Sequence, residues 1–156
     1  MRRKDLEITD LNEKLSILAQ CKVCRLGITL NDEPYIVPMN FGYTFAENIL
    51  TLYFHCAEEG KKIDILQANN KACFEVDCDH ALVQADSACG YSFHYACLIG
   101  FGNCFFIDNK EEKIYALNAL MRHQTNEDRD FTFSDKDIEQ VTIFKLVASE
   151  FTGKRH

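Results

Sequence analysis

The sequence predicts a mainly antiparallel β-barrel covered by a few helices. Runs rich in β-branched and aromatic residues recur along most of the chain, and helical spacing of hydrophobic residues is confined to a few short stretches. Hydrophobic residues make up 47% of the 156 residues, which is enough for a buried core. Because the sequence contains no internal repeat and no flexible linker, we expect residues 1–156 to form one domain.

The predicted order of elements is α, βββ, α, ββ, α, β. Asp10 and Glu13 have the spacing of a capping box at the start of the first helix, and β-branched residues dominate the last strand. The expected elements are a helix of about ten residues from Leu11, strands 23–30, 35–45 and 49–55, a helix over 58–68, strands 72–76, 81–85 and 95–108, helices over 111–123 and 135–140, and a strand over 141–147.

Charge and motifs exclude several classes of function. The formal net charge of -7 disfavours generic binding to nucleic acid. Acidic residues interrupt any signal-like apolar segment near Met1, and the longest mostly apolar run, 95–107, is too short to span a membrane, so we expect a cytoplasmic protein. The signatures of dinucleotide loops, P-loops, serine hydrolases and zinc proteases are absent from the sequence.

Eight cysteines are expected to be reduced, mostly buried side chains rather than a disulfide framework. Cys21 and Cys24 have the spacing of a zinc ligand pair, but no second pair of similar spacing accompanies them. We therefore expect no metal site, and metal binding at these two cysteines remains the alternative.

Strand 35–45 carries a proline inside a clear alternation of large and small side chains. Pro38 removes one ladder donor, which requires an edge strand or a bulge. Main-chain groups nearby could then bind a flat heteroaromatic ring, with Phe41 or Tyr43 stacked on it. An ordinary edge strand that a proline protects against aggregation explains the pattern equally well.

Two lysines stand where a predicted strand leads through Gly60 into a predicted helix. Lys61 and Lys62 fall in the first turn of that helix, where free N–H groups and the helix dipole favour an anion. This arrangement can hold a phosphate. A solvated helix face explains the lysines as well, and His55 nearby fits an ordinary strand histidine.

Together, several segments resemble the pyridoxamine 5'-phosphate oxidase-like FMN-binding split-barrel family, and within it the branch of nitroimidazole-resistance (Nim)-like flavoproteins. The similarity covers nearly the whole chain. The segments that carry it are Cys24–Gly27, Pro34–Tyr43, Tyr53–Ala57, Gly60–Lys62, Cys73–Asp77, Tyr91–Ser92 and Ile99–Gly102.

The resemblance implies a six-stranded antiparallel split β-barrel with a few covering helices. It also implies a homodimer with two FMN sites at the interface, each built from both protomers. The flavin phosphate would lie near Lys61 and Lys62, the isoalloxazine edge along residues 37–41, and His55 in the substrate pocket as the catalytic residue. The implied FMN-binding residues are Arg25, Val37, Pro38, Met39, Asn40, Phe41, Tyr53, Phe54, His55, Lys61, Lys62, Ser92 and His123.

The implied activity is that of an FMN-dependent oxidoreductase that passes electrons from NAD(P)H to a small electrophilic acceptor, such as a nitroaromatic compound. The resemblance does not extend to true pyridoxamine 5'-phosphate oxidase activity, because residues 139–156 lack the arginine-rich motifs that hold its substrate phosphate. Two alternatives remain open: a non-catalytic flavin- or tetrapyrrole-binding module, and a cofactor-free interaction protein whose barrel only dimerises.

Overall fold

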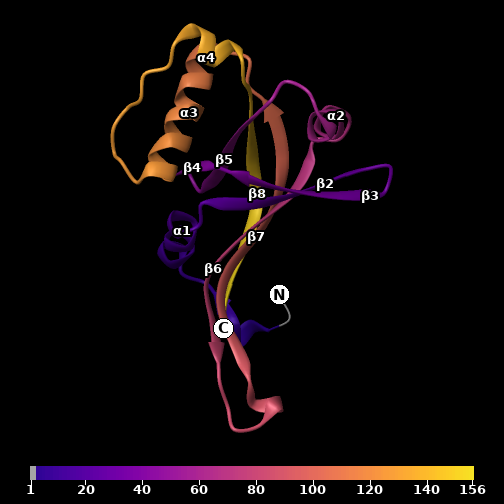
Figure 1. Ribbon diagram of the computed structural model, residues 1–156, viewed down its shortest axis with the longest axis vertical. Helices are drawn as coiled ribbons and strands as arrows, with labels where there is room; N and C mark the ends of the chain where they lie inside the picture. Colours follow the sequence, from indigo (N-terminus) through magenta and orange to yellow (C-terminus); the bar gives the residue numbers. More distant parts are fainter. Residues whose placement is uncertain (1–2) are drawn as a thin grey trace.

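The computed structural model describes residues 3–156, so residues 1 and 2 of the predicted domain lie outside the described residues. A long antiparallel sheet forms the body of the molecule, with helices along its sides (Figure 1). The strands are β1 (Glu7–Ile8), β2 (Val23–Leu30), β3 (Glu33–Asn40), β4 (Gly42–Ala46), β5 (Ile49–Cys56), β6 (Lys71–Val83), β7 (Ser92–Phe106) and β8 (Thr142–Arg155). The α-helices are α1 (Leu11–Gln20), α2 (Lys61–Ala68), α3 (Lys110–Thr125) and α4 (Asp135–Glu139), and short 3₁₀ turns cover Lys4–Leu6 and Ala88–Gly90.

The strand order is β3-β2-β6-β7-β8-β5-β4, with β1 paired to β8, and the neighbouring pairs are antiparallel. Over the described residues the end strands β3 and β4 form no ladder with each other, so the barrel is split rather than closed. The predicted fold class, a mainly antiparallel β-structure with covering helices, is confirmed. The predicted number of strands is wrong, because residues 3–156 contain eight strands rather than six.

The differences in strand bounds have local causes. The predicted strand 35–45 breaks at Phe41, where the chain leaves β2 and begins to pair with β5. The predicted strands 72–76 and 81–85 form one strand, β6, which continues past a bulge between Cys78 and Ala81 because β7 pairs with it on both sides. The last strand extends to Arg155 because β7 pairs with it along its length.

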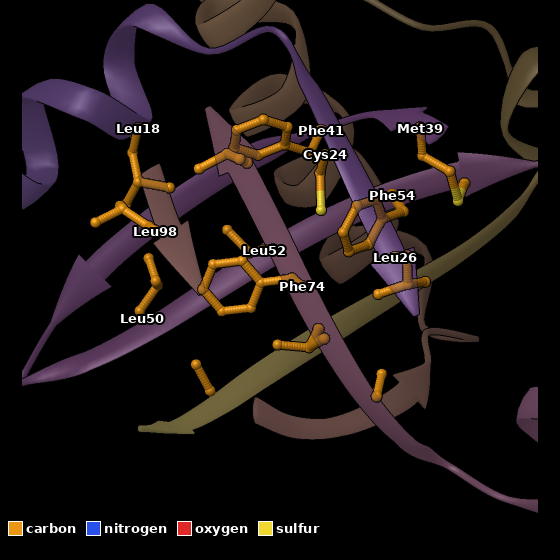
Figure 2. Packing of buried hydrophobic residues seen from close by; sticks show 14 of the residues in the cluster. Leu18, Cys24, Leu26, Met39, Phe41, Leu50, Leu52, Phe54, Phe74 and Leu98 are labelled. Carbon is orange, nitrogen blue, oxygen red and sulfur yellow. The ribbon is translucent and has the colours of Figure 1, made fainter. Parts of the chain in front are cut away.

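The main core lies between the strands, where large side chains of β2, β5, β6 and other elements meet (Figure 2). Phe54 and Phe74 are fully buried, and burial of such a side chain contributes about 1.5–3 kcal/mol. The alternation predicted for β3 is confirmed, because Met39 is buried whereas its neighbours Pro38 and Asn40 are exposed. The sheet therefore separates an inward apolar face from an outward face that can meet a ligand or partner.

Helix α3 packs on β4 and β5, opposite the main core, and forms a second apolar cluster there with Tyr53 and Ile143. Gly42 of β4 allows this close approach. A Cβ atom at Gly42 would lie 2.3 Å from the main-chain nitrogen of Leu120, so no larger residue fits without moving the helix. Over residues 3–156 no helix combines the length and the hydrophobicity needed to cross a membrane.

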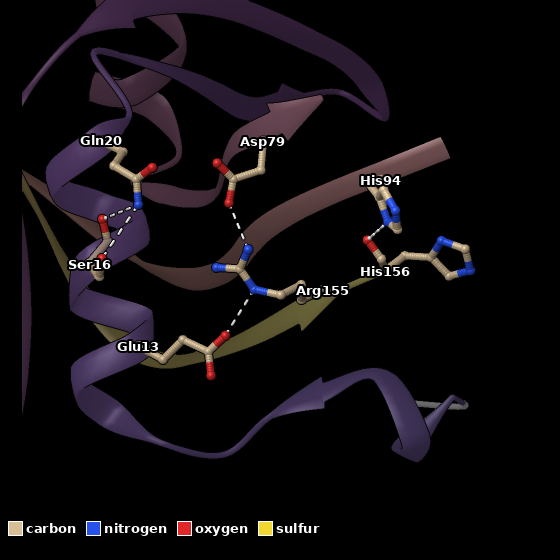
Figure 3. A network of polar contacts seen from close by, with 7 residues as sticks. All are labelled: Glu13, Ser16, Gln20, Asp79, His94, Arg155 and His156. Atoms are coloured by element: carbon tan, nitrogen blue, oxygen red, sulfur yellow. Dashed lines mark hydrogen bonds and ion pairs between the residues drawn. The ribbon is translucent and has the colours of Figure 1, made fainter. Parts of the chain in front are cut away.

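Arg155 ties the N-terminal helix to the long strands (Figure 3). Its Nε donates to Oε1 of Glu13 on α1 at 2.9 Å, and its Nη1 donates to Oδ2 of Asp79 on β6 at 2.6 Å. Only half of the predicted capping box forms, because Asp10 accepts from the N–H of Asn12 at 3.1 Å while Glu13 bonds to Arg155.

Candidate functional site

The start of α2 differs from the starts of the other α-helices. Asp10, Asn109 and Ser134 cap α1, α3 and α4 by accepting a main-chain N–H with their side chains. The N-cap of α2 is Gly60, which has no side chain and adopts φ 138° and ψ 162°, a conformation that strongly favours glycine. The helix therefore begins at Lys61 and not at residue 58 as predicted.

Two of the first four N–H groups of α2 remain available. Those of Ile63 and Asp64 donate to the carbonyl of Gly60 at 2.8 and 3.2 Å. Those of Lys61 and Lys62 have no acceptor in the described part of the chain. Such N–H groups, together with the positive end of the helix dipole, attract an anion.

The predicted position of the two lysines in the first turn of α2 is confirmed. The surroundings of Lys61 and Lys62 differ from each other. Lys61 donates from Nζ to Oε1 of Glu33 at 2.7 Å, and its Nζ lies 5.0 Å from the centre of the Tyr35 ring. Lys62 is half-exposed and makes no ion pair with any residue from 3 to 156. Lys61 thus lies against the beginning of β3.

Strand β3 brings the second predicted feature to the same place. It pairs with β2 alone among the strands described, so it is the edge strand that Pro38 predicts. It also contacts β5, the strand that leads to α2. The unpaired main-chain edge of β3 and the start of α2 therefore form one continuous candidate site.

Five predicted cofactor residues turn their side chains away from this site. Met39, Phe41 and Phe54 lie in the main core, and Val37 packs against it. Tyr53 packs under α3, where its ring meets that of Tyr115 edge-on at 5.9 Å. Phe41 is fully buried and cannot stack on a ligand outside the barrel. At Met39, Phe41 and Phe54 the main-chain atoms are the groups left to contact a flavin.

Arg25 lies on the outward face of β2, opposite Pro38 of β3. Its guanidinium donates to Glu75 at 3.1 Å and to Asp77, both on β6. These carboxylates hold the guanidinium over β6, and they raise its pKa further above the ordinary value. The guanidinium of Arg25 is therefore paired within the chain, on β6.

His55 is exposed near the end of β5, paired in register with Ile143 of β8. A hollow of about 350 Å³ lies beside Ile143, between the elements that carry Glu58, Ile63 and Lys113. His55 is not among the residues that line this hollow. Its place in a substrate pocket therefore stays a prediction.

His123 is buried in the last turn of α3, a helix that lies apart from α2 (Figure 1). Its Nε2 lies 2.7 Å from the carbonyl oxygen of Cys21, and because a carbonyl only accepts, Nε2 carries the proton. The ring also packs against Phe41 and Tyr43 at 4.7 and 5.1 Å. Burial lowers the pKa of His123, so it is a neutral structural side chain within one protomer.

Asn40 lies near the end of α3, where its side chain is hydrogen-bonded within the chain. Its Nδ2 donates to the carbonyl of Lys22 at 3.0 Å and to Oε1 of Gln124 at 3.2 Å, and Gln124 in turn donates to the carbonyl of Phe41 at 2.8 Å. These bonds fasten α3 to the break between β3 and β4. The amide of Asn40 is thus used within the chain.

A second hollow, of about 400 Å³, lies between α1, β4 and α3. Arg122 on its rim is ion-paired with Asp130, and Glu127 and Asp128 also line it. Glutamates also stand near the start of α2, but that site has two lysines where this hollow has one arginine.

Ser92 begins β7 in the projecting β6–β7 hairpin, at the far end of the molecule from α2 (Figure 1). Its hydroxyl lies 3.4 Å from Nδ1 of His156. Ser92 and His123 can join the site at α2 only across an interface between two copies of the chain.

Cys21 and Cys24 are both buried free thiols, and burial raises the pKa of each to about 12. A thiol with so high a pKa is a poor metal ligand at neutral pH. Within residues 3–156 no group of three or more histidine, cysteine, aspartate or glutamate side chains is arranged to hold a metal ion.

Sequence reasoning missed Glu33 and Tyr35 as neighbours of Lys61. The carboxylate of Glu33 meets an ammonium 28 residues further along the chain, and no local pattern signals such a contact. A signal for the open helix start was present, because a glycine directly before a lysine pair cannot supply a side-chain cap.

The pyridoxamine 5'-phosphate oxidase family profile matches residues 10–155 of the chain. The chain is also similar to the solved structure of a candidate 5-nitroimidazole antibiotic resistance protein from Bacteroides thetaiotaomicron, with 38% identity and a TM-score of 0.82, covering 96% of this chain and 86% of that one. No curated protein sequence matches the chain significantly.

Two more distant structures share the fold. The flavocytochrome Anf3 from Azotobacter vinelandii is 21% identical, with a TM-score of 0.79 over 100% of this chain and 72% of that one. A FAD and heme binding protein from Mycobacterium smegmatis is 20% identical, with a TM-score of 0.79 over 96% of this chain and 72% of that one.

Proposed function

This chain belongs to the pyridoxamine 5'-phosphate oxidase family, and on that premise we propose that it binds FMN and acts as an oxidoreductase. It passes electrons from NAD(P)H to a small electrophilic acceptor, such as a nitroaromatic compound. The start of α2 carries the proposal, because two lysines and unused N–H groups stand there beside the free edge of β3.

These residues fit a phosphate ester joined to a planar ring. A phosphate dianion suits two ammonium groups and two main-chain donors in one helical turn. The edge of β3 supplies main-chain groups that β2 does not use, and they can bind the polar edge of a ring. A flavin bound here supplies two-electron transfer between a nicotinamide and an acceptor.

The residues of the chain have separate tasks in this proposal. Lys61 and Lys62 hold the phosphate, and the main chain at Pro38 and Asn40 orients the ring. His55, exposed at the end of β5, holds a proton on its imidazole for the acceptor. Replacement by glutamine should therefore lower turnover without lowering flavin affinity.

The outward face of the sheet supports a homodimer. Ile36, Gly27, Cys73 and Phe101 are in register across β3, β2, β6 and β7, and Ile36 and Phe101 are 68% and 51% exposed. An apolar row of this kind marks an association surface. We propose that a second copy of the chain covers this row and completes the FMN site. Phe101→Lys should then give a monomer, as measured by light scattering.

The cytoplasmic location stays a prediction.

The visible absorption spectrum of the purified protein with and without FMN tests the proposal, followed by anaerobic NADH or NADPH and then a nitroimidazole. We expect flavin bands that bleach with a nicotinamide and return with the acceptor. Bound flavin that no nicotinamide bleaches would support the non-catalytic binding module instead. A protein that ignores added FMN would contradict the proposed function.

A further inference from the structure

The side chain of Lys61 contacts two residues of β3. Its Nζ donates to Oε1 of Glu33 at 2.7 Å, and it lies 5.0 Å from the centre of the Tyr35 ring. Both partners belong to the first residues of β3. The ammonium is therefore shared between a carboxylate and an aromatic face, and not simply solvated.

The hairpin that carries Glu33 is fixed relative to α2. Asn31 and Asp32 form its turn, with φ of 51° and 62°, which sets the direction in which β3 leaves β2. At the other end of the helix, Nδ2 of Asn69 donates to the carbonyl of Thr29 on β2 at 2.9 Å. The contact between Glu33 and Lys61 thus joins two segments that the fold already holds together.

Other charged side chains near the start of α2 do not share this contact. Glu58 and Glu59 precede Gly60 and are exposed, and neither is ion-paired within residues 3–156. Lys62 also makes no ion pair in that part of the chain. Glu33 acts on one lysine of the pair and leaves the other available.

We propose that Glu33 is a latch on this anion site: it occupies Lys61 until a phosphate monoester displaces it. The proposal rests on the proposed function, because it takes Lys61 and Lys62 as the phosphate ligands. A carboxylate and a phosphate compete for the same ammonium, and they repel each other when both are close to it. Lys62 gives the site a constant attraction for anions, and Lys61 joins only when the ligand carries enough charge to replace Glu33.

The latch predicts that Glu33 weakens the binding of FMN and leaves the binding of riboflavin unchanged, because riboflavin lacks the phosphate. Flavin fluorescence quenching gives both dissociation constants. Glu33→Gln should tighten FMN binding about twofold to fivefold, the range expected from loss of an exposed ion pair. Glu59→Gln is the matched control: it also removes one exposed negative charge before Lys61, and it should change FMN affinity by less than half as much.

The double variant tests whether the effect passes through Lys61. In a Lys61→Ala background, Glu33→Gln should no longer tighten FMN binding, because no latch remains to be removed. If Glu33→Gln tightens FMN binding equally with Lys61 and with Lys61→Ala, Glu33 acts by its negative charge alone and not through Lys61. That result would overturn the latch. So would an unchanged FMN affinity in the single Glu33→Gln variant.

Failure of the latch and failure of the proposed function give different results. If Lys61→Ala and Lys62→Ala leave the ratio of FMN to riboflavin affinity unchanged, the phosphate lies elsewhere and the proposed site fails. If that ratio falls in the lysine variants while Glu33→Gln does nothing, only the latch fails. Both sets of measurements use the full-length protein.

The pKa of the Glu33 carboxyl, measured by NMR titration, tests the displacement of Glu33 from Lys61 without requiring redox activity. Lys61 holds the pKa of Glu33 below its ordinary value, and Glu33 raises the pKa of Lys61. Saturation with FMN, or with inorganic phosphate, should move the pKa of Glu33 up towards its ordinary value, as Lys61→Ala should do without ligand. A pKa of Glu33 that stays low when phosphate saturates the site would contradict displacement.

Discussion

Helix α3 begins at the side chain of Asn109 and ends with His123 and Gln124 bonded to main-chain carbonyls, whereas α2 begins at Gly60 with no side-chain cap. Asn118 in the middle of α3 is bonded as well, because its Oδ1 accepts from the N–H of Phe131 at 2.7 Å. The N–H groups of Lys61 and Lys62 in α2, like those of Lys110 and Glu111 in α3, have no acceptor among the described residues. The two helices differ in their side chains: those of α3 are bonded within the fold, whereas the first turn of α2 carries two lysines and no capping side chain.

Gly42, which packs against α3, and Gly60, at the start of α2, are required for different reasons. Gly42 is required because α3 occupies the space where a side chain would be. Gly60 has open space around it and is required by its own main-chain conformation. One glycine allows tight packing, and the other shapes an open helix start. Substitutions at the two helices should therefore affect stability and ligand binding in different proportions.

The largest effect is expected from Gly42→Ala. The new Cβ would meet main-chain atoms of Ala119 and Leu120 at 2.3–2.4 Å, and a helix backbone cannot move aside cheaply. We expect a loss of about 3 kcal/mol or more in the free energy of unfolding, measured by urea denaturation. Gly27→Ala is the control, because its Cβ would be at least 3.6 Å from Cys73, and it should change stability by about 0.5 kcal/mol or less. Equal losses would refute the close-packing role of Gly42.

His123→Ala should have the next largest effect. It removes the hydrogen bond to the buried carbonyl of Cys21 and the packing against Phe41 and Tyr43. We expect a loss of about 2–4 kcal/mol in the free energy of unfolding. His55→Ala, at an exposed position, should lose no more than about 0.5 kcal/mol. If the two histidine variants unfold at the same urea concentration, His123 has no special structural role.

Gly60→Ala should lower the free energy of unfolding less than His123→Ala does, but it should also weaken FMN binding. The alanine must adopt a main-chain conformation that glycine alone tolerates, which costs about 1–2 kcal/mol. Any relaxation shifts the first turn of α2, so FMN affinity should fall more than riboflavin affinity. Fluorescence titration with both flavins checks this expectation. Equal losses for the two flavins would remove Gly60 from the phosphate site.

The smallest expected effect is a dependence of stability on pH. Burial lowers the pKa of His123, so the unfolded chain binds a proton at a higher pH than the folded chain does. The contribution of His123 is complete above the ordinary histidine pKa of about 6.5 and is lost as the pH falls below it towards the folded value. His123→Gln should flatten the urea midpoint between about pH 5 and 7. An unchanged slope in that variant would place the sensitivity in another group.

Local patterns in the sequence predict the elements well where the pattern itself decides the structure. Composition and the turn residues that follow predict strand 23–30, which agrees with β2, and the leucine spacing from residue 11 predicts α1. Lys61 and Lys62 in a first helical turn are confirmed because a glycine and then helix-forming residues follow the strand. The two-residue strand β1 is too short to carry any periodicity, and its pairing to β8 could not be predicted.

The site was harder to predict because its contacts join distant parts of the chain. The carboxylate of Glu33 and the carbonyl of Cys21 meet their partners only after folding. Segment 53–55 resembles the family as a block, although strand alternation puts Phe54 in the core and His55 outside. A resemblance over consecutive residues therefore cannot separate side chains that face a ligand from those that only support it.

A crystal structure of the protein with FMN tests the central claim most directly. We predict that the phosphate lies at the first turn of α2, within hydrogen-bond distance of the main-chain N–H groups of Lys61 and Lys62. The ring should then follow the free edge of β3. A phosphate bound instead at Arg122, in the hollow beside α3, would contradict the assignment of α2 as the open, ligand-binding helix.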